Sequence, residues 1–137
     1  VFIVIYLYTR YQFGNLSTIK AEKWLKKNNI DYQVLSPQSI NKYHIKQIIR
    51  LSDCIEDILL SPRGAGYKTW EKLGLNEYVF EEMSLNSLID FLEKSPILLK
   101  NLILFDNKRL VTGYNEEKIR AFLSPMYRQI IRQQSLV

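Results

Sequence analysis

The first 35 residues constrain the fold most, because two apolar runs stand on either side of an amphipathic segment. The run VFIVIYLY at residues 1–8 is continuous and ends at the polar pair Thr9-Arg10, a pattern typical of a buried strand. Behind it, apolar residues recur at helical spacing to about residue 28, and a second short strand is expected at residues 32–35. The candidate caps of this helix are Asn15, Ser17 and Thr18. Strand, helix and strand in this order predict a parallel pair joined by a right-handed crossover.

Residues 41–95 are expected to form several helices. Asn41 and Ser84 are candidate caps, and Gly74 is expected to end a helix over residues 67–73. Pro62 closes a shorter helix, and the helix that Ser84 begins stops before Pro96. The residues expected to face the core are Ile45, Ile48, Ile49, Ile55, Ile58, Leu59, Leu85, Leu88, Ile89 and Leu92.

The C-terminal third predicts a β-hairpin followed by a helix. Apolar runs at residues 102–105 and 109–112 flank the polar turn Asp106-Asn107-Lys108. The last helix is expected to begin near Asn115 and to bury Ile119, Phe122 and Leu123. The order βαβ, then helices, then ββα predicts an α/β protein with a thioredoxin-like fold and a helical insertion at about residues 41–95. We expect a single domain over residues 1–137, with a tail at residues 124–137.

Composition limits the classes of function. The chain has 137 residues, is 47% hydrophobic and has a formal charge of +5, which favours acidic partners or nucleic acid without choosing between them. One cysteine and one histidine exclude an intrachain disulfide and make a structural zinc site improbable, so we expect no metal or cofactor and a reducing, cytoplasmic location. The N-terminal apolar run is too short to span a bilayer and lacks a basic leader, so we expect no membrane segment.

Several motifs resemble the Spx/MgsR transcriptional regulators, a branch of the arsenate reductase-like thioredoxin fold. The run DNKRLVTGYNEEKIRAFL at residues 106–123 carries the strongest likeness to this family. Shorter matches, spread over nearly the whole chain, are LYT at 7–9, KWL at 23–25, IKQIIR at 45–50, SPR at 61–63, KLG at 72–74 and SPILLK at 95–100. The resemblance implies a factor that is not an enzyme, binds no specific DNA sequence alone, and docks on the C-terminal domain of the RNA polymerase α subunit, often under stress.

The family's redox switch is a CxxC pair near the first helix, and the resemblance places that pair at Asn15 and Thr18 of this chain. Neither residue is a nucleophile at neutral pH, so we expect them to cap the helix; the alternative is a weak anion site at exposed amides. The family's Arg-Pro segment before the third strand is Lys100-Asn101 here. Loss of that proline predicts loss of the cis peptide beside the thiol.

The partner surface that the resemblance implies is centred on residues 50–56, which read RLSDCIE. This stretch is one residue shorter than in the family and lacks its glycine. The expected partner-binding residues are Arg50, Ser52, Asp53, Cys54, Glu56 and Arg63. Arg50 either pairs with a partner carboxylate or complements the C-terminus of its own helix.

Three other residues have mainly structural interpretations. Cys54 is expected to be a semi-buried filler, the alternative being a sensor thiol ionised by Arg50 and Arg63. His44 is expected on a helix surface, and Trp70 is expected to pack in the core with Tyr67 one turn away.

Two other functions remain open at this point. An arsenate reductase-like thiol enzyme requires a nucleophilic cysteine at the helix N-terminus, which is missing, so it ranks low. An independent nucleic-acid-binding protein has only the basic charge in its favour. The apolar end Leu136-Val137 resembles termini by which Spx-type regulators reach the ClpXP protease, although a helix packed on the domain explains the tail equally well.

Overall fold

A computed structural model describes residues 4–10 and 15–123, apart from the side chain of Ala65. The strands are β1 Ile5–Thr9, β2 Tyr32–Leu35, β3 Leu102–Phe105 and β4 Leu110–Thr112. The helices are α1 Leu16–Lys27, α2 Lys42–Leu51, α3 Tyr67–Lys72, α4 Leu85–Lys94 and α5 Glu116–Ile119. Short 3-10 turns are η1 Ile55–Asp57, η2 Gly64–Gly66, η3 Pro96–Leu98 and η4 Arg120–Phe122. The tail and its Leu136-Val137 end lie outside the described residues.

The strands form one mixed sheet in the order β2-β1-β3-β4. β1 pairs in parallel with β2 and antiparallel with β3, and β4 completes the hairpin. Thr9 lies opposite Leu102 at the end of β1, so the residues that follow β1 come close to those that precede β3. The predicted βαβ unit and hairpin are confirmed.

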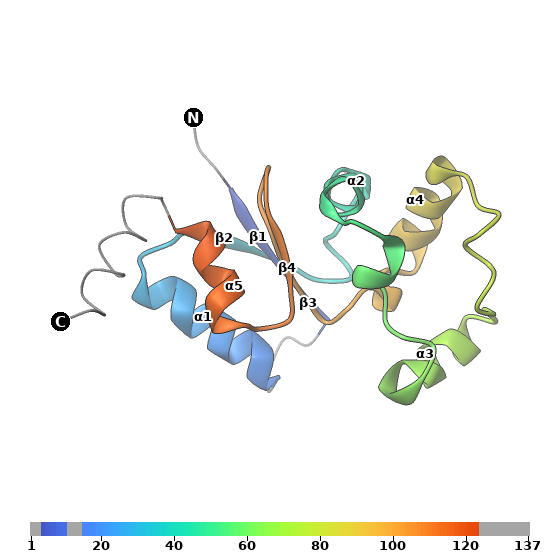
Figure 1. The fold of residues 1–137 in the computed structure, drawn as a ribbon, viewed down its shortest axis with the longest axis horizontal. Coiled ribbons are helices and arrows are strands. Elements are labelled where there is room, and N and C mark those ends of the chain that lie inside the picture. Colours follow the sequence, from blue (N-terminus) through green and yellow to red (C-terminus); the bar gives the residue numbers. More distant parts are fainter. Residues whose placement is uncertain (1–3, 11–14, 124–137) are drawn as a thin grey trace.

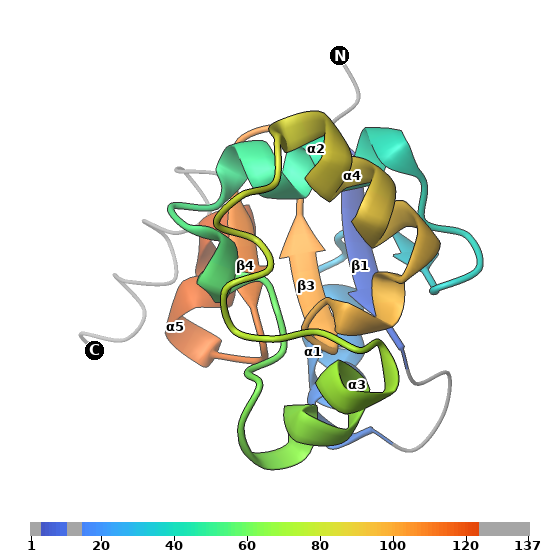
Figure 2. The same cartoon turned by 90° about the vertical axis from the view of Figure 1, so that its right-hand side faces the viewer.

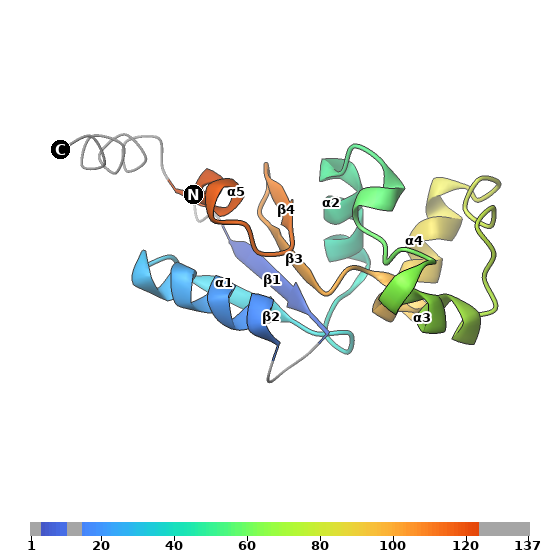
Figure 3. The ribbon, with the colours of Figure 1, turned by 60° about the horizontal axis from the view of Figure 1, so that its bottom comes forward.

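Helices cover the two faces of the sheet. α1 and α5 lie on one face, while α2, α3 and α4 lie on the other (Figures 1 and 3). Side chains along β3 point alternately to the two faces of the sheet. Leu102 and Leu104 belong to the core under α1 and α5, whereas Ile103 and Phe105 belong to the core under the other three helices. Each layer therefore has its own apolar core on opposite sides of one sheet.

Of the three candidate caps of the first helix, Asn15 begins α1, whereas Ser17 and Thr18 lie within it. The side chains of Asn15, Asn41, Ser84 and Asn115 each accept a backbone N–H in the first turn of α1, α2, α4 and α5. α3 ends at Leu73, and Gly74 follows with a φ of 68°, where the absence of a Cβ allows the left-handed conformation.

The insertion, residues 41–95, departs from expectation in two places. Leu85, expected to face the core, is 59% exposed, because it starts α4 at the outer end of the layer. The short helix expected near residues 55–59 is a single 3-10 turn over Ile55–Asp57. In Figure 2 the insertion faces the viewer, with α2 and α4 in front of β1 and β3.

Gly66 is buried where the chain folds back on itself inside the insertion. A Cβ at this position would collide with the backbone carbonyl oxygen of Ser61. Only glycine allows η2 to approach the Ser61–Arg63 segment this closely.

Candidate functional site

The N-terminus of α1 is occupied by hydroxyl and amide side chains. Asn15 Oδ1 accepts the backbone N–H of Thr18 at 3.1 Å and lies 3.2 Å from Thr18 Oγ1. Thr18 Oγ1 lies 3.0 Å from Thr9 Oγ1 at the end of β1. Asn15 is therefore the helix cap, as expected, whereas Thr18 lies in the first turn of α1 and supplies the N–H that Asn15 accepts.

Asn101 closes this group of side chains from the neighbouring strand. Its Oδ1 accepts the Arg10 backbone N–H and the Thr9 hydroxyl, each at 3.2 Å. This position stands next to Lys100 where the family has its proline, and no cis peptide occurs in the described parts of the chain. We call Thr9, Asn15, Thr18 and Asn101 the hydroxyl–amide network.

The hydroxyl–amide network is joined by hydrogen bonds among its own members. Thr9 and Thr18 are buried, and their two hydroxyl protons serve three short contacts, to Asn15, to Asn101 and between the hydroxyls themselves. Because there are two protons for three contacts, two of the contacts are hydrogen bonds at any moment. Asn15 Oδ1 accepts the backbone N–H of Thr18 in every case. The contacts of these hydroxyls with Asn15, with Asn101 and with each other are all between neutral groups, an arrangement that suits structure better than nucleophilic chemistry.

Arg50 is the first of the residues expected to bind a partner. Arg50 is exposed at the end of α2 and donates from Nη2 to the Asn107 carbonyl oxygen at 2.8 Å and from Nε to Gln47 Oε1 at 2.9 Å. Its guanidinium thus joins α2 to the turn of the hairpin. Arg50 also lies in the last turn of α2, so this contact is compatible with both interpretations that the sequence offered.

Cys54 contradicts the expectation of a semi-buried filler, because its side chain is exposed. Hydrogen bonds to Asp57 and then to Glu56 raise the pKa of this thiol. The neighbours that raise its pKa are acidic, which argues against the alternative of a thiolate promoted by Arg50 and Arg63. Asp53 is also exposed, and the Ser52 hydroxyl donates to the Ile49 carbonyl oxygen at 2.8 Å.

His44 was expected on a helix surface and is 7% exposed. Its Nδ1 accepts the Asn41 backbone N–H at 3.1 Å, which completes a capping box. Its ring lies 4.8 Å from that of Tyr6, edge to face. Burial lowers the pKa of His44, so the ring is a structural link between α2 and the sheet.

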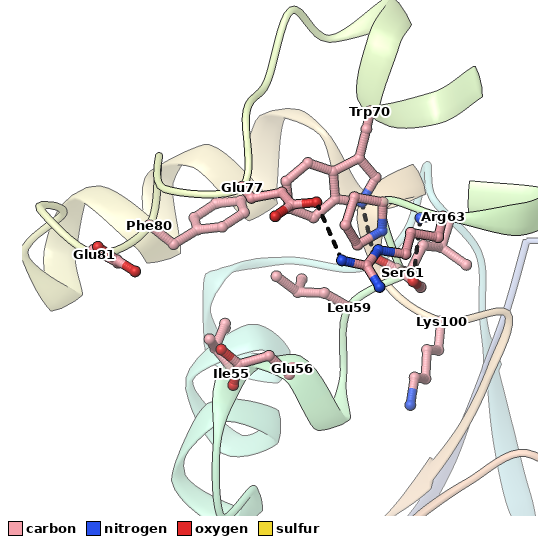
Figure 4. Close-up of a pocket in the computed structure, with 12 residues that line it drawn as sticks. Ile55, Glu56, Leu59, Ser61, Arg63, Trp70, Glu77, Phe80, Glu81 and Lys100 are labelled. Atoms are coloured by element: carbon pink, nitrogen blue, oxygen red, sulfur yellow. Dashed lines mark hydrogen bonds and ion pairs between the residues drawn. The ribbon is translucent and has the colours of Figure 1, made fainter. Parts of the chain in front are cut away.

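Glu56 and Arg63 line a pocket in the insertion (Figure 4). The pocket has a volume of about 640 Å³, within the range of ligand sites in proteins. Its lining residues are Ile55, Glu56, Leu59, Leu60, Ser61, Pro62, Arg63, Trp70, Glu77, Phe80, Glu81 and Lys100. We call this site the insertion pocket; sequence reasoning missed it, because its residues come from four separate segments.

Trp70 fixes one wall of the insertion pocket. Its indole Nε1 donates to the Leu60 carbonyl oxygen at 2.8 Å, and its ring meets Phe80 edge to face at 5.7 Å. Trp70 is buried as expected, whereas Tyr67 is 57% exposed and does not share its packing. The wall is rigid because a hydrogen bond and ring contact both hold the indole.

Two classes of site are absent from residues 4–10 and 15–123. No group of three or more His, Cys, Asp or Glu side chains is placed to hold a metal ion there. Over the same residues no helix has the length and apolar character needed to cross a bilayer.

Comparison with known proteins gives a consistent family. The ArsC family matches residues 15–122. Proteins named "Global transcriptional regulator Spx" from Lactiplantibacillus plantarum and Streptococcus pyogenes serotype M1 are 37% and 35% identical to this chain. The alignments cover 85% of this chain in both cases, and 87% and 85% of the two relatives.

Solved structures share the fold. A putative ArsC family related protein from Bacteroides fragilis superposes with a TM-score of 0.64 at 18% identity, over 85% of this chain and 95% of its own. An arsenate reductase from Vibrio cholerae superposes with a TM-score of 0.63 at 16% identity, and the match covers 88% of this chain and 98% of the reductase. The predicted thioredoxin-like fold with a helical insertion, of the arsenate reductase type, is confirmed.

Proposed function

The chain belongs to the ArsC family, and from this membership we propose that it is a Spx-like transcriptional regulator that binds the C-terminal domain of the RNA polymerase α subunit without a disulfide switch. The likeness to regulators named Spx over most of both chains supports the first part. The observation that carries the second is the hydroxyl–amide network, which fills the site of the family's thiol pair with neutral, mutually bonded groups.

The same network argues against thiol chemistry. Covalent catalysis by this family's enzymes needs a cysteine at the α1 N-terminus, where this chain has Asn15 and Thr18. We infer a non-enzymatic, cytoplasmic protein that needs no cofactor. A turnover assay with arsenate plus glutaredoxin or thioredoxin is expected to show no rate above background, and a rate that Cys54→Ser abolishes would overturn this inference.

The proposed docking surface contains Arg50, Ser52, Asp53, Cys54, Glu56 and Arg63. Arg50, Asp53, Glu56 and Arg63 are exposed and charged, so they offer complementary pairs to a partner. Arg50 is held in place by the Asn107 carbonyl oxygen and Gln47. A guanidinium already ordered in the free protein loses less side-chain entropy on binding.

Calorimetry with the purified α-subunit domain of the same organism tests this proposal. We expect measurable binding, and Arg50→Glu should weaken it by about tenfold or more if the arginine is central. Lys46→Glu is the matched control, because it makes the same charge change one turn earlier on α2, where Lys46 is also exposed. Thermal unfolding of both variants separates lost docking from the lost contact to Asn107.

Two results would contradict the proposal in different ways. No heat at high micromolar concentration, with no α subunit captured from cell extract, removes the polymerase partner. Equal weakening by both variants, or by neither, leaves a polymerase partner but moves its surface away from Arg50.

A further inference from the structure

The charges of the chain are unequally distributed between the insertion and the remainder. The insertion has seven Lys or Arg and nine Asp or Glu, whereas the rest of the chain has twelve and five. A protein with a formal charge of +5 therefore carries an acidic region. All of the residues that line the insertion pocket belong to that region except Lys100.

The rim of the insertion pocket presents carboxylates to solvent. Glu56, Glu77 and Glu81 are all exposed. Glu77 Oε1 lies 4.0 Å from Arg63 Nη2, and this long, exposed ion pair is weak. Neither Glu56 nor Glu81 forms an ion pair within the described residues, although Glu56 accepts a hydrogen bond from the Cys54 thiol.

The floor of the insertion pocket is apolar. Leu59 and Trp70 are buried beneath it, and Ile55 and Phe80 are half-buried at its sides. In Figure 4, Glu81 and Glu56 lie toward one end, and Lys100 lies toward the other. The volume of about 640 Å³ accommodates a large side chain together with the backbone on either side of it.

We propose that the insertion pocket docks a partner protein through a peptide segment that has a bulky apolar side chain next to lysine or arginine. The apolar side chain covers Leu59 and Phe80, and the basic side chains face Glu56 and Glu81. Charge complementarity selects this occupant, because Glu56 and Glu81 attract basic side chains to one end of the pocket, while Lys100 lies at the other end. This surface shares Glu56 and Arg63 with the proposed α-subunit surface but does not include Arg50, and it is tested with the purified chain alone.

Three capped peptides test the pocket directly. GSKRFLKRGS has both features, GSKRGGKRGS keeps only the charges, and GSEDFLEDGS keeps only the apolar pair. Binding is followed by calorimetry and by the fluorescence of Trp70. The chain has two tryptophans, so all measurements use a Trp24→Phe background in which Trp70 is the one that remains. We expect the first peptide to bind and to change the Trp70 spectrum, and the second to bind at least about tenfold more weakly.

A pair of neighbouring glutamates provides the matched control. Glu81 lines the pocket, while Glu82 is exposed beside it and does not. Glu81→Lys should weaken binding of GSKRFLKRGS by about tenfold, and Glu82→Lys by much less, since only the first charge enters the pocket. The double change Glu56→Lys with Glu81→Lys should reverse the preference and admit GSEDFLEDGS, a gain that loss of folding cannot produce.

Three results would overturn the proposal. The first is absence of binding by GSKRFLKRGS at about millimolar concentration, equivalent to a free energy weaker than about −4 kcal/mol. The second is equal affinity for the peptide that lacks the apolar pair. The third is equal weakening by the Glu81 and Glu82 variants, which would show a general electrostatic effect instead of a pocket.

Discussion

The α1 N-terminus and the insertion pocket differ in whether their polar side chains bond to one another. At α1, the hydroxyl–amide network consists of neutral side chains that bond to one another. In the insertion pocket, exposed carboxylates surround an apolar floor, and two of them have no ion-pair partner among the described residues. The polar groups at the α1 N-terminus therefore hold one another in place, whereas those around the insertion pocket are open to solvent.

Breaking the insertion is expected to have the largest effect on stability. Gly66→Ala forces its new Cβ against the Ser61 carbonyl oxygen and should lower the free energy of unfolding by about 3 kcal/mol. Gly64→Ala is the matched control, because its φ is 61° but nothing lies near the new Cβ, so strain alone should cost about 1 kcal/mol. Urea unfolding compares the two. Equal losses would contradict the close packing of η2 against the pocket wall.

The hydroxyl–amide network is broken by removing its hydroxyls one at a time. Thr18→Val keeps the shape of a buried side chain and should cost about 1–2 kcal/mol through lost hydrogen bonds. A double-mutant cycle with Thr9→Val isolates the contact between the two hydroxyls, which lie 3.0 Å apart. We expect a coupling energy of at least about 0.5 kcal/mol. Strictly additive effects would mean that this contact contributes nothing to stability.

The junction between the insertion and the sheet predicts a smaller, pH-dependent effect. Burial lowers the pKa of His44, so the unfolded chain binds a proton more readily than the folded chain does. Stability contributed by neutral His44 is complete above the ordinary histidine pKa and falls as pH drops below about 6.5. Protonation of Nδ1 also removes the acceptor of the Asn41 N–H.

His44→Gln tests this pH dependence. Glutamine at this capping-box position retains an acceptor but does not titrate, so its unfolding midpoint should change less between about pH 7 and pH 5 than that of the wild type. His44 is the only histidine in the 137 residues. Identical profiles for both proteins would assign the loss of stability in acid to carboxylates instead.

The sequence predicts features whose causes are local. Caps at Asn15, Asn41, Ser84 and Asn115, the parallel β1–β2 pair and the β3–β4 hairpin follow from neighbouring residues, and the structure confirms them. The burial of His44 depends on Tyr6 and Phe105, which lie far away in the chain, so helix periodicity did not predict it.

The candidate sites show the same limit. Asn101 bonds to Thr9 across a separation of 92 residues, and only the register of β1 with β3 brings them together. The substitution at Lys100-Asn101 was visible in the sequence, but its new contact was not. Similarly, residues 51–57 predicted a partner surface without indicating that Cys54 is exposed among acidic neighbours.

The central claim is that this regulator binds its polymerase partner without a redox switch at α1. Its most direct test is calorimetry of the complex with the α-subunit domain, before and after oxidation of the chain by diamide, with Cys54→Ser alongside. The hydroxyl–amide network has no oxidisable group, so we expect the dissociation constant to agree within about twofold in all four samples. A change of about tenfold on oxidation that Cys54→Ser abolishes would contradict this account and make Cys54 the sensor.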